Sequence, residues 1–130
     1  MIIELTPETF FEHVKKEGPL HVVMHYGETC GPCKMTMPHY EKVEAHFVEF
    51  KVFNVKFYKF HQWAASNKEF IQENNLKTDG VPTFRYYYMG DVITHSTRSF
   101  NDADELKRNI MDAVKAIETT MGQEFNLYEG

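Results

Sequence analysis

The sequence predicts an α/β fold in which a central mixed β-sheet is sandwiched between helices. Three observations predict this class: helical and strand patterns alternate along the chain, two adjacent strands precede the last helix, and no repeat or linker divides the sequence. The 130 residues fit one domain with a single core. We expect the order helix, strand, helix, strand, helix, strand, strand, helix over residues 1–118, and a loosely ordered tail over 119–130.

Flanking residues mark the first helix and the first strand. Thr6-Pro7 supplies an N-cap and a proline suited to the first helical position, and Gly18-Pro19 breaks the helix that follows. The apolar run Leu20–Tyr26 then predicts a buried strand. A short loop leads from this strand to Cys30.

The middle of the chain predicts two helices with a strand between them. Apolar residues at three-to-four spacing predict a helix over residues 33–47, in which Pro38 should cause a kink rather than a break. Alternation of apolar and polar residues over 50–58 predicts a strand. Helical spacing returns over 61–76, so we expect a helix there.

The last third of the chain predicts a hairpin and a helix. Residues 83–88 and 92–97 have strand patterns, and Met89-Gly90-Asp91 between them predicts a tight turn. The clearest apolar stripe in the sequence covers residues 102–118, which we expect to form a helix capped by Asn101.

Charge and hydropathy exclude several classes of partner. A formal net charge of −5 disfavours nonspecific binding to nucleic acid or anionic membranes, because both reward a basic surface. No apolar stretch approaches the roughly 20 residues of a membrane span, and the N-terminus lacks a secretory signal pattern. We expect a cytoplasmic monomer that binds neither nucleic acid nor membrane; the mature form of an exported protein would begin in the same way.

The only two cysteines of the chain lie in Cys30-Gly31-Pro32-Cys33. Thiols at this spacing can form and break a disulfide with little movement of the backbone. A helix N-terminus stabilises a thiolate, which is the species that attacks disulfides. Two cysteines are too few ligands for a metal site; of the nearest histidines, we expect His25 to be buried with a hydrogen-bond partner and His39 to lie on a helix surface. The motif therefore predicts thiol–disulfide exchange without metal or bound cofactor.

With these elements in place, the chain resembles the thioredoxin family over about residues 2–118. Four features match together: Cys30-Gly31-Pro32-Cys33 after a buried strand, Lys34 after the second cysteine, Pro38 further along the helix, and Val81-Pro82-Thr83 before the hairpin. The resemblance implies a thioredoxin fold with Cys30 as an exposed nucleophile and Cys33 as a buried resolving thiol.

The resemblance also implies where a substrate binds. The proline equivalent to Pro82 is cis in the family and lies against the disulfide, and the backbone of the preceding residue, here Val81, pairs with the substrate chain. The residues that we expect to contact the substrate are Thr29, Gly31, Pro32, Val81, Pro82 and Thr83.

Several positions depart from the family pattern. Thr29 stands where the family usually has a tryptophan, and Met24 stands where it has a buried aspartate that is thought to assist deprotonation of the resolving thiol. By alignment, Val52 replaces the lysine partner of that aspartate, Arg98 replaces a glycine near the site, and the segment before Pro82 is longer than usual. We expect Cys33 to lose its proton without a nearby carboxylate, so that the mixed disulfide is released slowly.

The sequence favours a reductase of protein disulfides that is re-reduced by another dithiol system, such as a thioredoxin-reductase-like enzyme. Gly-Pro between the cysteines accompanies low potential in the family, about −270 mV for thioredoxin against about −120 mV for the strongest oxidants. Three alternatives stay open. They are a disulfide oxidase or isomerase, a glutathione-dependent enzyme of the glutaredoxin type, against which Gly-Pro argues, and a protein-docking module whose thiols are incidental.

Overall fold

Five β-strands form one mixed sheet in the computed structural model, which describes residues 2–50 and 54–121. The strand order is β1-β3-β2-β4-β5. β1 and β2 both pair in parallel with β3, whereas β4 is antiparallel to β2, and β5 is antiparallel to β4. The strands are β1 (Ile3–Glu4), β2 (Leu20–Tyr26), β3 (Val55–His61), β4 (Thr83–Tyr88) and β5 (Asp91–Thr97).

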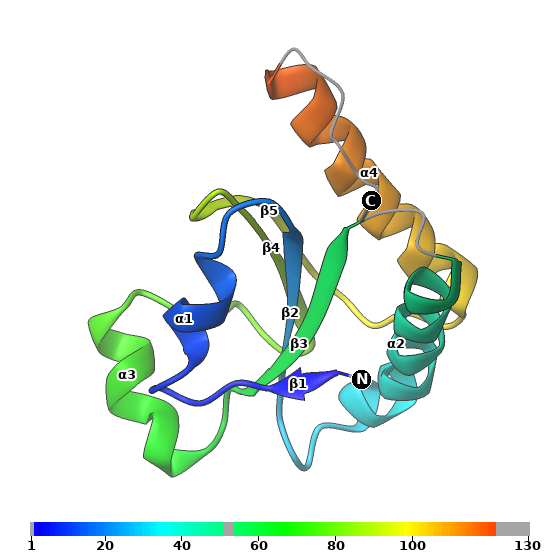
Figure 1. The fold of residues 1–130 in the computed structure, drawn as a ribbon. Helices are drawn as coiled ribbons and strands as arrows, with labels where there is room; N and C mark the ends of the chain where they lie inside the picture. Colours follow the sequence, from blue (N-terminus) through cyan, green and yellow to red (C-terminus); the bar gives the residue numbers. More distant parts are fainter. Residues whose placement is uncertain (1, 51–53, 122–130) are drawn as a thin grey trace.

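Helices cover both faces of this sheet (Figure 1). α1 and α3 lie on one face, and α2 and α4 lie on the other. A buried hydrophobic cluster fills each interface, so the sheet separates two parts of the core. The predicted α/β class, with a mixed sheet between helices, is confirmed. The helices are α1 (Phe10–Val14), α2 (Gly31–Phe50), α3 (Lys68–Glu73) and α4 (Ala103–Met121), with a short 3-10 helix at Ala65–Asn67.

The central strand β2 lies where the apolar run predicts it. Val22 and Met24 belong to the cluster under α2 and α4, and Val23 belongs to the cluster on the opposite face. The hydroxyl of Tyr40, on α2, lies 3.0 Å from the carbonyl oxygen of Val22 and 2.8 Å from that of Tyr58. These contacts fix α2, and with it the cysteine motif, against the centre of the sheet.

The boundary between α2 and β3 differs from the prediction. α2 passes through Pro38 without a break and continues to Phe50, where the sequence pattern predicts a strand. β3 begins at Val55 and ends at His61, and residues 51–53 lie outside the described part of the chain. Both faces of β3 carry buried side chains, with Phe57 in the cluster under α2 and α4 and Tyr58 in the opposite cluster, although Lys56 is exposed.

The predicted helix over residues 61–76 is much shorter in the structure. His61 ends β3, and the helical part is confined to the 3-10 turn and α3, which ends at Glu73. Asn75 has a left-handed backbone (φ 54°), and the N–H of Leu76 donates to the carbonyl of Ile71 at 2.9 Å. This is a Schellman ending, which stops the helix before the end of the apolar spacing.

The first helix also starts later than predicted, at Phe10. Thr9, not Thr6, holds its N-cap position, and the hydroxyl of Thr6 lies 3.1 Å from that of Thr9. Thr6 therefore belongs to a turn that precedes the helix. The two-residue strand β1, just before this turn, is too short to produce a sequence pattern.

The hairpin forms as predicted, and the last helix differs at its ends. Met89 and Gly90 both have positive φ (53° and 87°), as a two-residue type I′ turn requires. The cap of α4 is Asp102, whose carboxylate accepts the N–H of Glu105 at 2.8 Å, and Asn101 does not take this role. α4 continues to Met121; of the expected tail, residues 122–130 lie outside the described part.

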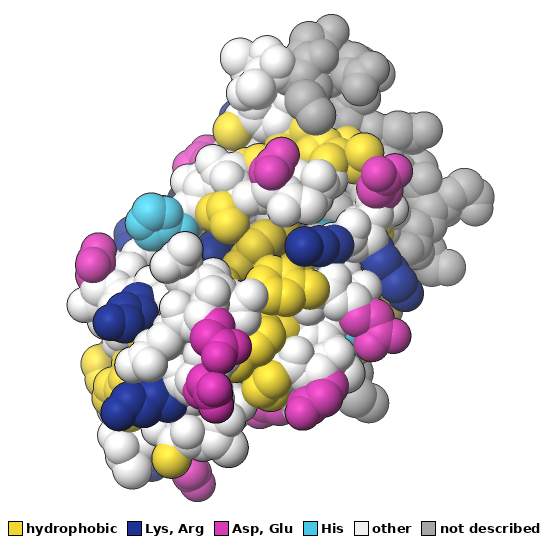
Figure 2. All heavy atoms as spheres, turned by 90° about the vertical axis from the view of Figure 1, so that its left-hand side faces the viewer, with side chains coloured by type: hydrophobic (Ala, Val, Ile, Leu, Met, Phe, Trp, Pro, Cys, Tyr) yellow, Lys and Arg dark blue, Asp and Glu magenta, His cyan; other side chains and the backbone are white. Residues whose placement is uncertain are grey.

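The surface mixes both signs of charge. On the side that carries α1 and α3, acidic and basic side chains are interspersed around exposed hydrophobic side chains (Figure 2). Among the helices of residues 2–50 and 54–121, none is both long enough and apolar enough to cross a bilayer.

Candidate active site

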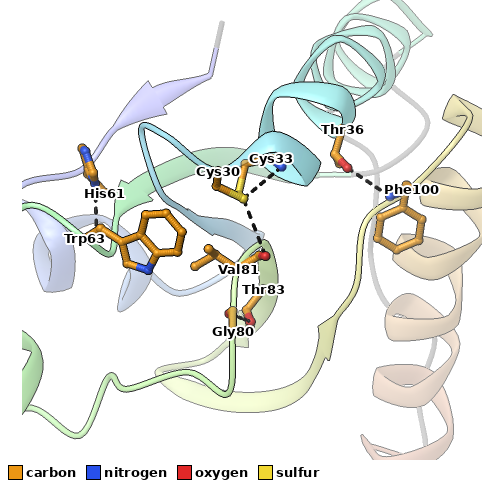
Figure 3. Close-up of a disulfide and its surroundings, with 9 residues drawn as sticks. All are labelled: Cys30, Cys33, Thr36, His61, Trp63, Gly80, Val81, Thr83 and Phe100. Carbon is orange, nitrogen blue, oxygen red and sulfur yellow. Dashed lines mark hydrogen bonds between the residues drawn. A yellow bond between two sulfur atoms is a disulfide. The ribbon is translucent and has the colours of Figure 1, made fainter.

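The two cysteines form a disulfide at the start of α2 (Figure 3). Cys30 directly precedes the helix, and Cys33 lies in its first turn. The N–H of Cys30 donates to the carbonyl of Gly27 at 3.2 Å, and the N–H of Lys34 donates to the carbonyl of Cys30 at 3.1 Å. The loop after β2 therefore leads straight into the helix and holds both sulfurs at its N-terminus.

The surroundings of the two sulfurs differ in hydrogen bonding more than in exposure. Cys30 is 4% exposed and Cys33 is 1% exposed, so the expected exposed nucleophile is nearly covered in the disulfide state. The N–H of Cys33 donates to the Sγ of Cys30 at 3.1 Å. This donor and the N-terminus of α2 both stabilise negative charge on the Cys30 sulfur. Cys30 is thus the better placed of the two to exist as a thiolate.

The Val81-Pro82 segment lies against the disulfide. Its peptide bond is cis, as the resemblance implies, and the Val81 carbonyl oxygen lies 3.7 Å from the Sγ of Cys30. Thr83, 1% exposed, donates its hydroxyl to the carbonyl of Gly80 at 2.7 Å and lies 2.8 Å from the hydroxyl of Thr97. The Thr83 side chain therefore fastens this segment to β5.

The other predicted substrate-binding residues lie around Cys30. Thr29, Gly31 and Pro32 are exposed, Val81 is half-buried, and Pro82 is buried. Open space surrounds Gly31, because a Cβ built there meets no atom within 4 Å. The structure thus leaves the outer side of the cysteine loop free for another molecule.

Within the described ranges, no group of three or more His, Cys, Asp or Glu side chains is placed to hold a metal ion. His25 is fully buried on β2, and its Nδ1 lies 2.8 Å from the Oε1 of Gln62. Burial, with the nearby positive charge of Arg85, lowers the pKa of His25 to about 3. The prediction that His25 is a core residue with a hydrogen-bond partner is confirmed.

Comparison with known proteins identifies the family. Residues 1–112 match the sequence model described as Thioredoxin. The chain belongs to the thioredoxin family.

Solved thioredoxin structures share the fold. Thioredoxin f2 of Chlamydomonas reinhardtii superimposes with a TM-score of 0.70 and 26% identity, over 86% of this chain and 95% of that one. The long form of thioredoxin f from spinach chloroplast superimposes with a TM-score of 0.70 and 28% identity, over 86% of this chain and 85% of that one. The Malassezia sympodialis thioredoxin Mala s 13 superimposes with a TM-score of 0.68 and 23% identity, over 87% of this chain and 90% of that one. At this identity the likeness bears on the fold alone. A comparison with curated proteins finds no match.

The predicted thioredoxin fold is therefore confirmed. Family membership, the fold and the close cysteine pair together support thiol–disulfide oxidoreductase activity. The residues that depart from the usual thioredoxin pattern are what distinguish this site from that of its relatives.

The position of the missing aspartate is apolar, but a lysine lies beside it. Met24 is fully buried and belongs to the same cluster as Cys33. Val52, aligned with the lysine of the family pair, lies outside the described residues, and it is Lys59 on β3 that stands in register with Met24. The ammonium nitrogen of Lys59 lies 5.8 Å from the ring centroid of Tyr26. The replacement of the aspartate by Met24 is thus visible in the structure, and the replacement of its lysine partner stays a prediction.

Arg98 is held by its own loop and by α4. Its guanidinium carbon lies 4.4 Å from the ring centroid of Phe100, and its Nη2 lies 3.3 Å from the carboxylate of Glu105. The N–H of Phe100 donates to the hydroxyl of Thr36 at 3.0 Å, which ties this loop to α2 one turn beyond the cysteines. Sequence analysis missed Thr36, because its partner is distant in the chain.

Sequence analysis also missed Trp63, the only tryptophan of this thioredoxin. It follows β3, is 54% exposed, and is drawn together with the disulfide and Val81 in Figure 3. A Cβ at Gly27 would overlap its indole ring, so the ring packs directly on the loop that precedes Cys30. The sequence pattern places Trp63 inside the predicted helix over residues 61–76, so it gives no signal of this contact.

Proposed function

We propose that this thioredoxin reduces the disulfides of other proteins through a dithiol–disulfide cycle of Cys30 and Cys33. The observation that carries the proposal is the Cys30–Cys33 disulfide at the start of α2, with the Cys30 sulfur against the Val81 carbonyl. Gly-Pro between the cysteines supports the reductive direction, because in this family it accompanies potentials of about −270 mV.

The cycle has two steps in the direction of reduction. The thiolate of Cys30 attacks one sulfur of a substrate disulfide, the Cys30–substrate bond forms, the substrate S–S bond breaks, and the leaving thiolate takes up a proton. Cys33 then loses its proton and attacks the Cys30 sulfur. The second substrate thiol leaves and is protonated, and the Cys30–Cys33 bond closes. Two electrons pass from the dithiol to the substrate.

The proposal includes the partners and the setting of this cycle. The substrates are proteins with accessible disulfides, and an external dithiol system, such as a thioredoxin-reductase-like enzyme, returns the two electrons. No bound cofactor is needed, because the cysteines carry the electrons. We extend the proposal to a monomer in the cytoplasm, where thiols are kept reduced.

Reduction of insulin with dithiothreitol as the electron source tests the proposed function. The wild-type protein should accelerate the precipitation of free insulin B chain, and Cys30→Ser should give only the rate of dithiothreitol alone. Cys33→Ser should accumulate a covalent mixed disulfide with insulin, because the resolving thiol is missing. If the wild type gives no acceleration, or Cys30→Ser retains it, the proposed cycle is wrong and a docking role becomes the better account.

A further inference from the structure

Trp63 packs on the loop before Cys30, and it comes from a different element than the tryptophan usual in the family. The site lacks an aromatic residue before the first cysteine, since Thr29 occupies that position. Trp63 instead arrives from the end of β3 and covers Gly27. The carbonyl of Gly27 in turn accepts the N–H of Cys30. The indole therefore packs on the residue whose carbonyl holds the backbone of Cys30.

The backbone around Trp63 is fixed by hydrogen bonds to several elements. The N–H of Trp63 donates to the Nδ1 of His61 at 3.2 Å. The neighbouring Gln62 donates its backbone N–H to the carbonyl of Tyr26 at 2.7 Å and its side-chain amide to that of Leu76 at 2.8 Å. A half-exposed aromatic side chain on a fixed backbone loses little conformational freedom when a partner covers it. Such a side chain is well suited to binding.

A groove of about 410 Å³ begins at this ring and reaches the segment that contacts the disulfide. Its lining includes Trp63, Ala64 and Ala65 from the segment after β3, and Lys77, Thr78 and Gly80 from the segment before Pro82. Gly80 directly precedes Val81, whose carbonyl oxygen lies 3.7 Å from the Cys30 sulfur. The groove therefore ends one residue before the backbone group that faces the Cys30 sulfur.

The occupant follows from the geometry of the exchange reaction. A substrate cysteine bonded to Cys30 carries its chain neighbours with it, and an extended chain advances about 3.3 Å per residue. The neighbouring side chains of the substrate therefore lie within reach of the groove. The indole and the two alanine methyl groups offer apolar surface to such a side chain. Three further lining residues, Lys68, Lys77 and Asp79, carry charge.

We infer that Trp63 is a specificity-determining residue: together with this groove it receives an apolar side chain next to the reacting cysteine of a protein substrate. This inference rests on the proposed function and names the substrate class. Trp63 takes no part in the exchange of sulfur bonds and acts by binding the substrate segment.

Two peptides that differ at one position test the inference. Each carries one cysteine linked by a disulfide to thionitrobenzoate, with leucine or serine as the next residue. Reduced wild-type protein should release thionitrobenzoate from the leucine peptide with a kcat/KM about tenfold higher, as expected for burial of one apolar side chain. Trp63→Ala should reduce this preference to about twofold or less, mainly through KM, whereas Trp63→Phe should keep most of it.

Phe50→Ala is the matched control, because Phe50 is an aromatic side chain of similar exposure, 58%, at the far end of α2. It should retain the wild-type preference. A wild type that does not distinguish the peptides, or a Trp63→Ala protein that distinguishes them as well as the wild type, would overturn the inference. Failure of the reduced wild type to release thionitrobenzoate faster than a Cys30→Ser, Cys33→Ser protein would instead overturn the proposed function.

Discussion

Met24 puts an apolar side chain into the buried cluster that holds Cys33, at the position of the family's aspartate. Cys33 is 1% exposed, and the side chains packed with it in the cluster under α2 and α4 are apolar or aromatic, with Met24 among them. A buried thiol without a nearby base loses its proton reluctantly, because burial disfavours the charged form. Lys59 stands in register with Met24, and its ammonium nitrogen lies over the Tyr26 ring, 5.8 Å from the ring centroid.

Met24→Asp should accelerate the second step of the cycle. A carboxylate next to Cys33 can accept its proton, and general-base assistance of this kind contributes about 100-fold or more in favourable geometry; we expect an increase of at least about fivefold. The free energy of unfolding should fall by about 3 kcal/mol, because a charge enters the core. Quenched-flow trapping of the mixed disulfide, followed by mass spectrometry, measures the rate.

Met24→Asn is the control for this substitution. It has the size and polarity of aspartate without a group that accepts the proton, so it should lose stability without any gain in rate. Equal resolution rates in Met24→Asp and the wild type would show that deprotonation of Cys33 does not limit this step.

His25 makes the stability of the protein depend on pH. Its pKa is lowered to about 3 by burial, whereas in the unfolded chain it is about 6.5. Between these two values the unfolded chain binds a proton that the folded chain does not, so stability falls as the pH falls through this window. Linkage gives a loss of about 2 kcal/mol between pH 7 and pH 5.

Urea unfolding at pH 7 and pH 5 checks this prediction, with His25→Leu as the comparison. The variant should be less stable at pH 7, because the Oε1 of Gln62 loses its partner. Its stability should depend on pH less steeply than that of the wild type, by about 2 kcal/mol over the same interval. His21, whose pKa is also lowered by burial, keeps its contribution in both proteins. Identical pH dependence in the two proteins would exclude His25 as the source.

At the scale of elements, the structure shows which of two neighbouring residues caps α4, a choice that the sequence leaves open. Asn101 and Asp102 are both good capping residues, and the structure uses Asp102. Asp102→Ala should lower the free energy of unfolding by about 1 kcal/mol, since it removes the acceptor for the Glu105 N–H. Asn101→Ala should change it by less than about 0.5 kcal/mol. Paired urea titrations measure both, and a larger loss for Asn101→Ala would reverse the assignment.

Elements with a strong local signal could be predicted from the sequence. A pattern of a few residues is enough to predict β2, the cysteine motif, the hairpin turn and the body of α4. The boundary between α2 and β3 has no such local signal, because β3 takes its limits from pairing with β2. The same dependence on register hides Lys59 as the neighbour of Met24.

The residues of the candidate site also fall into two groups, those that the sequence predicts and those that only the structure shows. The two cysteines and Val81-Pro82 are recognisable from their motifs, and the structure brings them together. Trp63 could not be placed, since its contact with Gly27 joins two loops that are far apart in sequence. Thr36 reaches Phe100 in a comparable way. Contacts of this kind follow from the fold and leave no local pattern.

On the scale of the whole molecule, the site forms where several elements meet at one end of the sheet. β2 ends before the cysteine loop, β3 ends before Trp63, and β4 begins just after Pro82. The two parts of the core hold these ends in place from opposite faces of the sheet. The reactive pair thus rests on a rigid scaffold, while the loops around it carry the features peculiar to this thioredoxin.

The midpoint potential of the Cys30–Cys33 couple tests most directly whether this protein is a reductant. Equilibration in dithiothreitol buffers, thiol labelling and mass spectrometry measure it on the intact chain. We predict a value of about −260 mV or lower, as for a reductant that passes electrons to protein disulfides. A value above about −200 mV would contradict the account and identify the protein as an oxidant or isomerase.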